Sequence, residues 1–241
     1  MRRRADLLLV ERGFFDSRAK AQAAIAAGGV TADGRPVRKA SDALPVDAAI
    51  AAEAPHPWVS RAGVKLAAAL DAFAIDAAGR VCLDIGASTG GFTEVLVARG
   101  AAKVYAVDVG HGQLHPRLAA DPRVVSLEGC DARRLTAAEV PEPVGLLVAD
   151  VSFISLKLVL PAVTDRIADG GHLVALVKPQ FEAGRAHLKK GIVREEAVRE
   201  AVVEDIATLA RDLGLTVLGT MASPIAGGDG NVEYLIGARR G

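Results

Sequence analysis

The chain has 241 residues, of which 51% are hydrophobic, and its 29 lysines and arginines balance 29 acidic residues. This length accommodates one α/β domain plus a small module, and a net charge of zero leaves the charge distribution, not the total, to indicate partners. No apolar run approaches the roughly 20 residues of a membrane-spanning helix, and Asp6 follows the initial MRRR too soon for a secretory signal, so we expect a cytoplasmic protein with no membrane partner.

The first 40 residues are basic, with nine lysines and arginines against four acidic residues. Asp6 predicts the start of a short helix, and Asp16 or Ser17 predicts the start of a second one. The dipeptide Asp33-Gly34 follows between short apolar runs and predicts a tight hairpin turn. Two helices and a hairpin make a small α+β module with a basic surface.

The order of residues in this module resembles the small RNA-binding domain named after ribosomal protein S-four. The resemblance is carried by the SRxxAxxxI pattern of the second helix, the following G-x-V strand and the glycine of the turn. It implies such a domain over residues 1–55, bound to structured RNA. The residues that it makes RNA contacts, chiefly to phosphates, are Arg4, Arg18, Lys20, Arg35 and Arg38. On charge alone, a solvated basic face remains the alternative.

A proline-bearing segment with the only tryptophan, Trp58, predicts a linker over residues 56–62, in which the tryptophan is a packing anchor. Apolar strand candidates then alternate with amphipathic helices. The strand candidates are residues 81–86, 103–110, 123–129, 144–153 and 171–179, and the clearest helices are residues 90–100 and 194–214. Nearly all-apolar strands separated by helices predict a parallel sheet covered on both faces, hence a doubly wound, Rossmann-like α/β domain over residues 63–241.

The stretch CLDIGASTGGFTE, residues 82–94, predicts a strand, a glycine-rich turn and a helix, the layout of a nucleotide pocket. The dinucleotide motif G-x-G-x-x-G is absent because Ser88 stands two residues after Gly86, although a dehydrogenase would explain Asp108. The phosphate loop is absent because Phe92 stands where a lysine is required. In a doubly wound sheet, the ligand lies beyond the carboxyl ends of the strands.

An aspartate stands at or just after the end of four successive strand candidates. Asp108 lies where a carboxylate can accept both hydroxyls of a ribose. A pocket for S-adenosylmethionine needs a backbone turn against the amino-acid part, this carboxylate and a polar group for the adenine amine, here Asp131. We therefore expect S-adenosylmethionine as the cofactor. The expected cofactor-binding residues are Asp84, Gly86, Ala87, Ser88, Gly90, Gly91, Asp108 and Asp131.

Five ordered motifs, SRAGVKL, DIGASTGGFTE, VADVSF, VKPQF and NVEYL, resemble those of the FtsJ-type RNA ribose 2′-O-methyltransferases. The whole chain looks like a member of the TlyA family of ribosomal RNA cytidine 2′-O-methyltransferases, a family also described under the name haemolysin. The resemblance makes Lys65, Asp150, Lys178 and Glu233 the catalytic tetrad, with Lys178 as proton acceptor. Asp131 departs from the family pattern, which often has an amide residue there. Taken singly, Asp150 could instead cap a helix.

Chemistry gives these residue types a rationale. A ribose 2′-hydroxyl is a poor nucleophile, whereas the sulfonium methyl is already activated, so the enzyme must align the two and accept a proton, without a metal. Lys178 can accept a proton only as the neutral amine, which burial, the positive sulfur and the neighbouring Lys65 favour. Asp150 and Glu233 would orient the two lysines. Cys82 and Cys130 lack metal-like spacing and predict buried, inert thiols.

The resemblance implies ribosomal RNA or a ribosomal subunit as partner. In this family, longer members with an added C-terminal helix methylate both subunits and shorter members only the large one. The sequence ends eight residues after Glu233, so we expect a cytidine of large-subunit RNA as substrate. Two alternatives stay open, an RNA-binding ribosome assembly factor with a vestigial methyltransferase domain and a membrane-lytic protein. Neither the exact target nucleotide nor the oligomeric state follows from the sequence.

Overall fold

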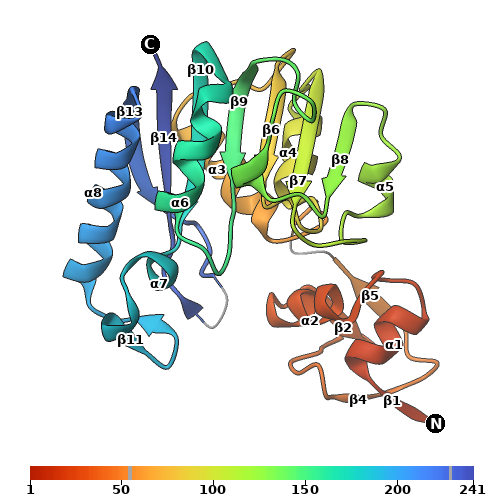
Figure 1. The fold of residues 1–241 in the computed structure, drawn as a ribbon. Helices are drawn as coiled ribbons and strands as arrows, with labels where there is room; N and C mark the ends of the chain where they lie inside the picture. The colour runs from red at the N-terminus through yellow and green to blue at the C-terminus, as the bar shows by residue number, and fades with distance from the viewer. Residues whose placement is uncertain (54–55, 228–229) are drawn as a thin grey trace. The chain divides into compact units, whose positions relative to one another are not determined.

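The computed structural model describes residues 1–53, 56–227 and 230–241. The chain divides into two compact units, Met1–Pro57 and Trp58–Gly241, each with its own hydrophobic core (Figure 1). The boundary expected at residue 55 lies outside the described residues. Trp58, expected in the linker, belongs to the second unit, where a side chain at position 63 in place of Gly63 would collide with its ring.

The described residues of the first unit form two helices and five short strands. In chain order they are β1 (Arg2–Arg4), α1 (Ala5–Glu11), α2 (Arg18–Ala26), β2 (Val30–Ala32), β3 (Arg35–Pro36), β4 (Ala43–Pro45) and β5 (Ile50–Ala52). Ser17, not Asp16, caps α2, since its Oγ accepts a hydrogen bond from the Lys20 backbone N at 3.3 Å. Asp33 and Gly34 have φ angles of 50° and 74°, the left-handed pair expected of a tight hairpin turn between β2 and β3.

One apolar core holds this unit together. Ala21, Ala24 and Ile25 lie on a single face of α2 and are buried, as their spacing predicts. They belong to one cluster with Leu9 of α1 and Val30 of β2. Strands β3, β2 and β5 form an antiparallel sheet and β1 pairs with β4. The basic side chains are left at the surface of a small, packed module.

The second unit is an α/β domain. Its helices are α3 (Ala62–Ala72), α4 (Gly91–Ala98), α5 (Pro116–Ala119), α6 (Leu156–Val163), α7 (Pro179–Glu182) and α8 (Glu196–Asp212), with single 3₁₀ turns η1 (Ala132–Arg134), η2 (Thr164–Arg166) and η3 (Arg185–His187). Its strands are β6 (Val81–Ile85), β7 (Lys103–Asp108), β8 (Val124–Glu128), β9 (Val144–Ala149), β10 (Ile167–Val177), β11 (Leu188–Lys189), β12 (Ile192–Val193), β13 (Leu215–Ala222) and β14 (Tyr234–Arg240). All five expected strands and both expected helices are present.

Seven strands form the main sheet, in the order β13-β14-β10-β9-β6-β7-β8. Strands β10, β9, β6, β7 and β8 pair in parallel, but β14 runs antiparallel to both β10 and β13. The prediction of a parallel sheet is therefore wrong at this edge, and the sheet is mixed. The reason is that β14, the last strand in the chain, lies between β13 and β10 and runs antiparallel to both.

Helices cover both faces of this sheet (Figure 1). Alternate residues of β9 belong to different cores: Leu146 and Val148 pack with α3 and α4, whereas Leu147 and Ala149 pack with α6 and α8. Strands with two buried faces are apolar at nearly every position, which is why the sequence shows continuous apolar runs. Cys82 lies in the core on the side of α3 and α4, and burial raises the pKa of its thiol to about 12, as expected of an inert cysteine.

The buried carboxylate of Asp6 connects the elements of the first unit. The sequence predicted Asp6 as the cap of α1. In the structure Arg4 occupies the N-cap position, and Asp6 lies in the first turn of the helix. Its oxygens accept hydrogen bonds from Arg4 at 3.0 and 3.1 Å, from Arg18 at 2.9 Å and from Gln22 at 2.8 Å. The hydrogen bond from Arg4, then those from Gln22 and Arg18, hold the pKa of Asp6 well below its usual range against the effect of burial.

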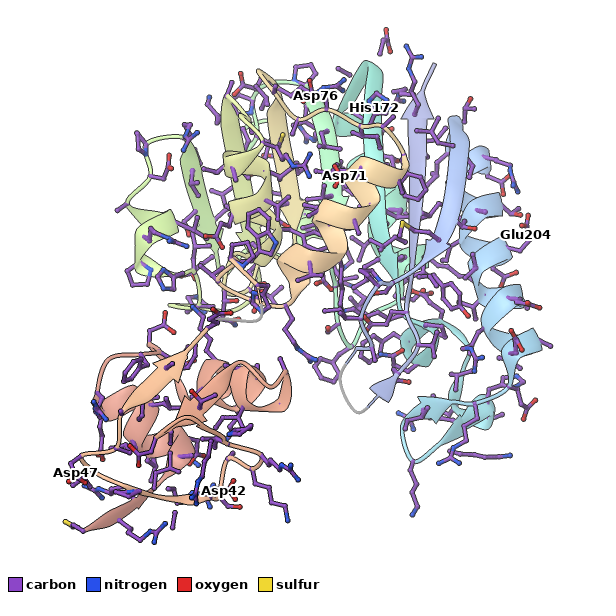
Figure 2. The ribbon with its side chains drawn as sticks, turned by 180° about the vertical axis from the view of Figure 1, so that it is seen from behind. Asp42, Asp47, Asp71, Asp76, His172 and Glu204 are labelled. Atoms are coloured by element: carbon purple, nitrogen blue, oxygen red, sulfur yellow. The ribbon has the colours of Figure 1, made fainter. Side chains whose placement is uncertain are left out.

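Because its pKa is lowered by folding, the Asp6 carboxylate stabilises the first unit above about pH 4 and loses this effect as the pH falls further. We expect Asp6→Asn to lower the free energy of unfolding of this unit by about 1–3 kcal/mol at neutral pH. Amide hydrogen exchange over residues 1–53 of the full chain would measure this. Asp47→Asn is the matched control, since Asp47 is exposed (Figure 2). Equal protection in both variants would contradict the prediction.

Candidate active site

Strand register brings predicted catalytic residues to one edge of the sheet. Val177 at the end of β10 pairs with Tyr234 at the start of β14. Lys178 directly follows Val177 and Glu233 directly precedes Tyr234, so these two residues are neighbours across the antiparallel pair. Asp150 follows the last residue of the parallel strand β9, which neighbours β10. A lysine and two carboxylates therefore meet where the parallel strands end.

Two neighbouring groups hold the side chain of Lys178. Its Nζ lies 2.6 Å from Oδ1 of Asp150 and donates a hydrogen bond to Oγ of Ser152 at 2.8 Å. Lys178 is only 8% exposed, so the charge is largely removed from water. Asp150 is not the cap of the following helix, because Ser155 caps α6. The geometry thus removes the structural alternative for Asp150 and pairs it with the lysine.

A second ion pair joins Lys65 to Glu233. Lys65 comes from α3, and its Nζ lies 2.5 Å from Oε2 of Glu233. The two residues are 8% and 3% exposed. Gly227 lies against the carboxylate of Glu233, so any side chain at position 227 would displace it. The four predicted catalytic residues therefore form two lysine–carboxylate pairs, in which Lys65, Lys178 and Glu233 are buried and Asp150 is partly exposed.

The turn after β6 has the shape expected of a ligand-binding loop. Gly86 has a φ of 82°, and a side chain there would collide with the backbone carbonyl of Asp150. Gly90, with a φ of 96°, occupies the N-cap of α4. A side chain at Gly91 would collide with Oγ of Ser60. Close packing therefore leaves no room for a side chain at these glycines, and at Gly86 the neighbour is the backbone of the strand end that carries Asp150.

Two carboxylates shape the loops beyond β7. Asp108 accepts hydrogen bonds from the backbone N–H of Ser88 at 2.8 Å and of Gly110 at 2.7 Å. Glu128, at the end of β8, accepts three hydrogen bonds, all from backbone N–H groups of residues 112–114. These donors lower the pKa of Glu128. Glu128 was not expected from the sequence, although it ends a strand just as Asp108 does.

A cavity of about 280 Å³ opens beside these loops. Three of the expected cofactor residues, Gly86, Asp108 and Asp131, line it together with the catalytic candidate Asp150. The other expected cofactor residues do not line it and lie at the end of β6, in the turn or at the start of α4: Asp84, Ala87, Ser88, Gly90 and Gly91. Among the lining residues not expected from the sequence, Gln113 accepts a hydrogen bond from the hydroxyl of Ser88 at 3.1 Å.

Asp84 is completely buried at the end of β6. Its Oδ2 accepts a hydrogen bond from the hydroxyl of Thr93 at 2.6 Å, whereas its Oδ1 has no partner among the described residues. Burial, opposed by the Thr93 hydrogen bond, raises the pKa of Asp84 to about 7. A buried acceptor with unused capacity beside a glycine turn is suited to a cationic ligand.

Asp131 lies at the mouth of the cavity but already has a strong partner. Its carboxylate accepts hydrogen bonds from the guanidinium of Arg133, the shortest at 2.6 Å, and caps η1 through the Arg133 backbone N–H. These hydrogen bonds lower the pKa of Asp131 to about 2. An adenine amine would have to share this carboxylate with Arg133, which the sequence did not indicate.

Phe153 is the unexpected feature of the site. Its side chain is 92% exposed, it lines the cavity, and its φ of 63° is unusual for a bulky residue. Its ring lies 5.2 Å from that of Phe181, and Nζ of Lys178 lies 6.0 Å from the Phe181 ring centroid. A strained, exposed aromatic residue thus provides a flat apolar surface near the predicted catalytic Lys178.

The first unit presents the basic residues expected to bind RNA in two different states. Arg4 and Arg18 are bound to Asp6 with about half of each side chain exposed, and Lys20 pairs with Asp16 at 2.9 Å. Arg35 and Arg38 are exposed. Arg35 lies on β3, directly after the Asp33-Gly34 turn. The carboxylates therefore position three of the five cations, and the other two stand on or beside the hairpin.

Two classes of site have no support in the part of the chain that the structure describes. No cluster of three or more histidine, cysteine, aspartate or glutamate side chains has metal-binding geometry in residues 1–53, 56–227 and 230–241. None of the helices described is both long and apolar enough to cross a membrane.

Comparison with known proteins gives two family matches. Residues 58–240 match the FtsJ-like methyltransferases and residues 3–50 match the S4 domain. The 16S/23S rRNA (cytidine-2′-O)-methyltransferase TlyA of Mycobacterium tuberculosis is 48% identical over 241 residues, covering 99% of this chain and 90% of that protein. Hemolysin A of Brachyspira hyodysenteriae is 40% identical over 237 residues, 96% of this chain and 98% of the relative.

A third relative and a solved structure agree with these matches. The 23S rRNA (cytidine-2′-O)-methyltransferase TlyA of Campylobacter jejuni is 37% identical over 179 residues, covering 73% of this chain and 69% of that protein. The structure of a candidate haemolysin from Streptococcus thermophilus superimposes with a TM-score of 0.79 at 40% identity, covering 99% of this chain and 88% of the other. The family match extends over most of the sheet, the glycine turn and both lysine–carboxylate pairs. The chain therefore belongs to the FtsJ-like methyltransferase family, in the form that carries an S4 domain at its N-terminal end.

Proposed function

We propose that this protein transfers a methyl group from S-adenosylmethionine to the ribose 2′-hydroxyl of a cytidine in ribosomal RNA, and that the large subunit carries the target. The observation that carries the proposal is the pair of buried lysine–carboxylate ion pairs at the carboxyl edge of a methyltransferase sheet. A binding protein has no need to bury two lysines beside a ligand cavity, because burying charge is costly. The cost is justified where a proton must be handled.

The residues around the glycine turn fit the expected cofactor. The unpartnered Oδ1 of Asp84 suits a cationic amino group, and Gly86 lets the backbone approach a ligand closely. Asp108 lines the cavity and has acceptor capacity beyond its two backbone donors, which a ribose can use. When bound, S-adenosylmethionine supplies an electrophilic methyl group on a positive sulfur.

Lys178 is our candidate for the group that receives the hydroxyl proton. A neutral lysine amine has two N–H donors and one lone pair. Ser152 accepts one N–H of Lys178 at 2.8 Å, and Oδ1 of Asp150, which has no hydrogen-bond partner among the described residues, lies 2.6 Å from Nζ, so that the lone pair of a neutral amine can face the 2′-hydroxyl. Glu233 holds Lys65 in place at 2.5 Å, so that neither of these two buried charges is left unpaired.

The substrate class rests on three features. The S4 domain presents exposed or half-exposed arginines and lysines, which suit RNA phosphates. Phe153 offers an exposed ring beside Lys178, and nucleobases stack readily on such rings. Both TlyA relatives are named as cytidine 2′-O-methyltransferases of 23S RNA, and the name of one of them also includes 16S RNA. Large-subunit RNA is the shared substrate, and we propose it here.

Purified large and small subunits, incubated separately with the enzyme and S-adenosylmethionine labelled in its methyl group, test the proposal. We expect label in large-subunit RNA, at the 2′-oxygen of one cytidine mapped by resistance to alkaline cleavage. A comparable rate on the small subunit would overturn the choice of subunit. Absence of label in both would favour an assembly factor with a vestigial methyltransferase domain.

Lys178→Ala should reduce the rate of methyl transfer by at least about 100-fold, because the proton acceptor is lost. Binding of S-adenosylmethionine, measured by calorimetry, should stay within a few-fold, since the lysine acts on the incoming hydroxyl. The matched control is Lys157→Ala, which removes an exposed lysine paired with Asp205 on the surface. Substantial turnover by Lys178→Ala would remove this residue from the mechanism.

Asp84 makes cofactor binding dependent on pH. Its raised pKa, about 7, means that the carboxyl is increasingly neutral below pH 7, whereas a cationic amino group requires the carboxylate. We expect the affinity for S-adenosylmethionine to fall by about tenfold per pH unit below 7 and to level off above it. Calorimetry between pH 5.5 and 7.5 would measure this, with proton release seen as a dependence on buffer. Asp84→Asn should bind weakly with no such slope, and a slope retained in the variant would contradict the assignment.

A further inference from the structure

A basic hairpin follows the segment that carries Lys178. Strands β11 and β12 pair antiparallel, Leu188 opposite Val193 and Lys189 opposite Ile192. Between residues 183 and 194 the sequence contains no acidic residue. Its lysines and arginines are all exposed: Arg185, Lys189, Lys190 and Arg194. These four exposed cations concentrate positive charge at the hairpin, and none of them belongs to the proposed catalytic residues.

The turn of this hairpin carries a lysine where the backbone disfavours one. Lys190 and Gly191 have φ angles of 54° and 79°, the conformation of a turn that usually has Asn-Gly. A lysine in the left-handed region is strained, and such strain is found where the side chain has a use at the surface. The tip of the hairpin therefore presents Lys190 at a conformational cost.

The hairpin is anchored close to the catalytic edge. Val193 is buried and Leu188 is partly buried, so one face of the hairpin packs on the domain. The side-chain amide of Asn231 donates a hydrogen bond to the carbonyl of Gly191 at 3.3 Å, and Asn231 precedes Glu233 by only two residues. Figure 1 shows β11 beyond α7, at the end of the sheet toward which β9 points. The positive charge is therefore held at the same edge as the tetrad.

Little of this charge is neutralised by neighbouring acids. In the described part of the chain, one ion pair involves the four cations, between Lys189 and Glu195 at 4.0 Å. Both side chains are largely exposed, 71% and 65%, so the pair is weak. By contrast, Lys157 and Arg211 elsewhere on this domain each lie within 2.8 Å of a carboxylate. The hairpin cations remain available to an external anion.

We propose that the β11–β12 hairpin binds the phosphate backbone of the RNA strand that carries the target nucleotide, as a second RNA contact separate from the S4 domain. This inference rests on the proposed function, because the strand must lie at the edge where Lys178 meets the 2′-hydroxyl. The hairpin has no exposed aromatic or large apolar residue, as a membrane or a base-reading surface would need. Lysine and arginine on a fixed ribbon suit repeated phosphates, whose contacts give affinity and register.

The test uses the full chain and the double variant Lys189→Gln/Lys190→Asn. Asparagine tolerates the left-handed conformation at position 190, so the turn is preserved. Binding is titrated with protein-free large-subunit RNA over a series of salt concentrations. We expect the Kd to rise about 3- to 10-fold at the lowest salt and the slope of log K against log salt to flatten by about 1 to 2. With ribosomal subunits as substrate, KM should rise while kcat stays within about twofold.

The matched control is the double variant Arg99→Gln/Arg239→Gln, which removes two cations away from this edge. Arg239 of β14 lies opposite His172 of β10 in the strand register, at the far end of the sheet, where Figure 2 shows His172. Arg99 forms an ion pair with Asp71. Equal affinity and salt slope in both double variants would overturn the proposal, as would a wild-type chain that does not bind RNA. An effect seen with whole subunits but absent with protein-free RNA would assign the hairpin to a ribosomal protein instead. Failure of the proposed function is distinct, since it appears as binding without methyl transfer.

Discussion

Four charged side chains lie almost entirely out of water at one edge of the sheet, and the architecture around them supplies each with its partner. A buried, unpaired lysine or carboxylate would be prohibitively costly. Lys178 is therefore matched with Asp150 across adjacent strands, and Lys65 with Glu233 across 168 residues of sequence. The antiparallel direction of β14 matters here, because the register that pairs Tyr234 with Val177 brings Glu233, which precedes the strand, to the side of Lys178, which follows β10.

The same edge links the ion pairs to the cofactor side of the site. Gly86 lies against the carbonyl of Asp150, and Asp150 N donates to the carbonyl of Ile85 at 2.9 Å. The turn that would receive the cofactor and the carboxylate that holds Lys178 thus share backbone contacts. Since Ser88 is bound to Asp108 in turn, a shift in either loop is transmitted to the other. A methyl donor and a hydroxyl that must be aligned would benefit from such connected loops.

Much of this could be read from the sequence because local physics decides it. Apolar runs predicted the central strands, since two buried faces leave no room for alternation, and Asp33-Gly34 predicted its turn because few other pairs accept two positive φ angles. The strand direction of β14 could not be predicted, because it depends on pairing with β10 and not on its own residues.

The roles of single acidic residues were also beyond sequence reasoning where the partner is distant or unexpected. Asp6 looked like a helix cap, yet it binds Arg18 and Gln22 of the next helix. Asp131 looked free for an adenine, yet it holds Arg133 two residues away. Nothing in the motif VADVSF indicates that Phe153 has a positive φ and an exposed ring. These features arise from tertiary contacts that a pattern of residue types does not encode.

Two kinds of cation emerge from this comparison, and they suit different tasks. Arg18 is fixed by the buried carboxylate of Asp6, and Lys178 and Lys65 are fixed by theirs, so their donors point in defined directions. Lys190 at the hairpin tip is exposed and has no carboxylate partner among the described residues. A proton transfer, or the placement of an RNA strand in one register, requires donors that point in a fixed direction. Attraction between a cation and phosphates acts over a longer range and tolerates varied geometry. A methyltransferase that must both hold a long RNA and align one hydroxyl has use for both kinds, and the carboxylates decide which lysine or arginine belongs to which.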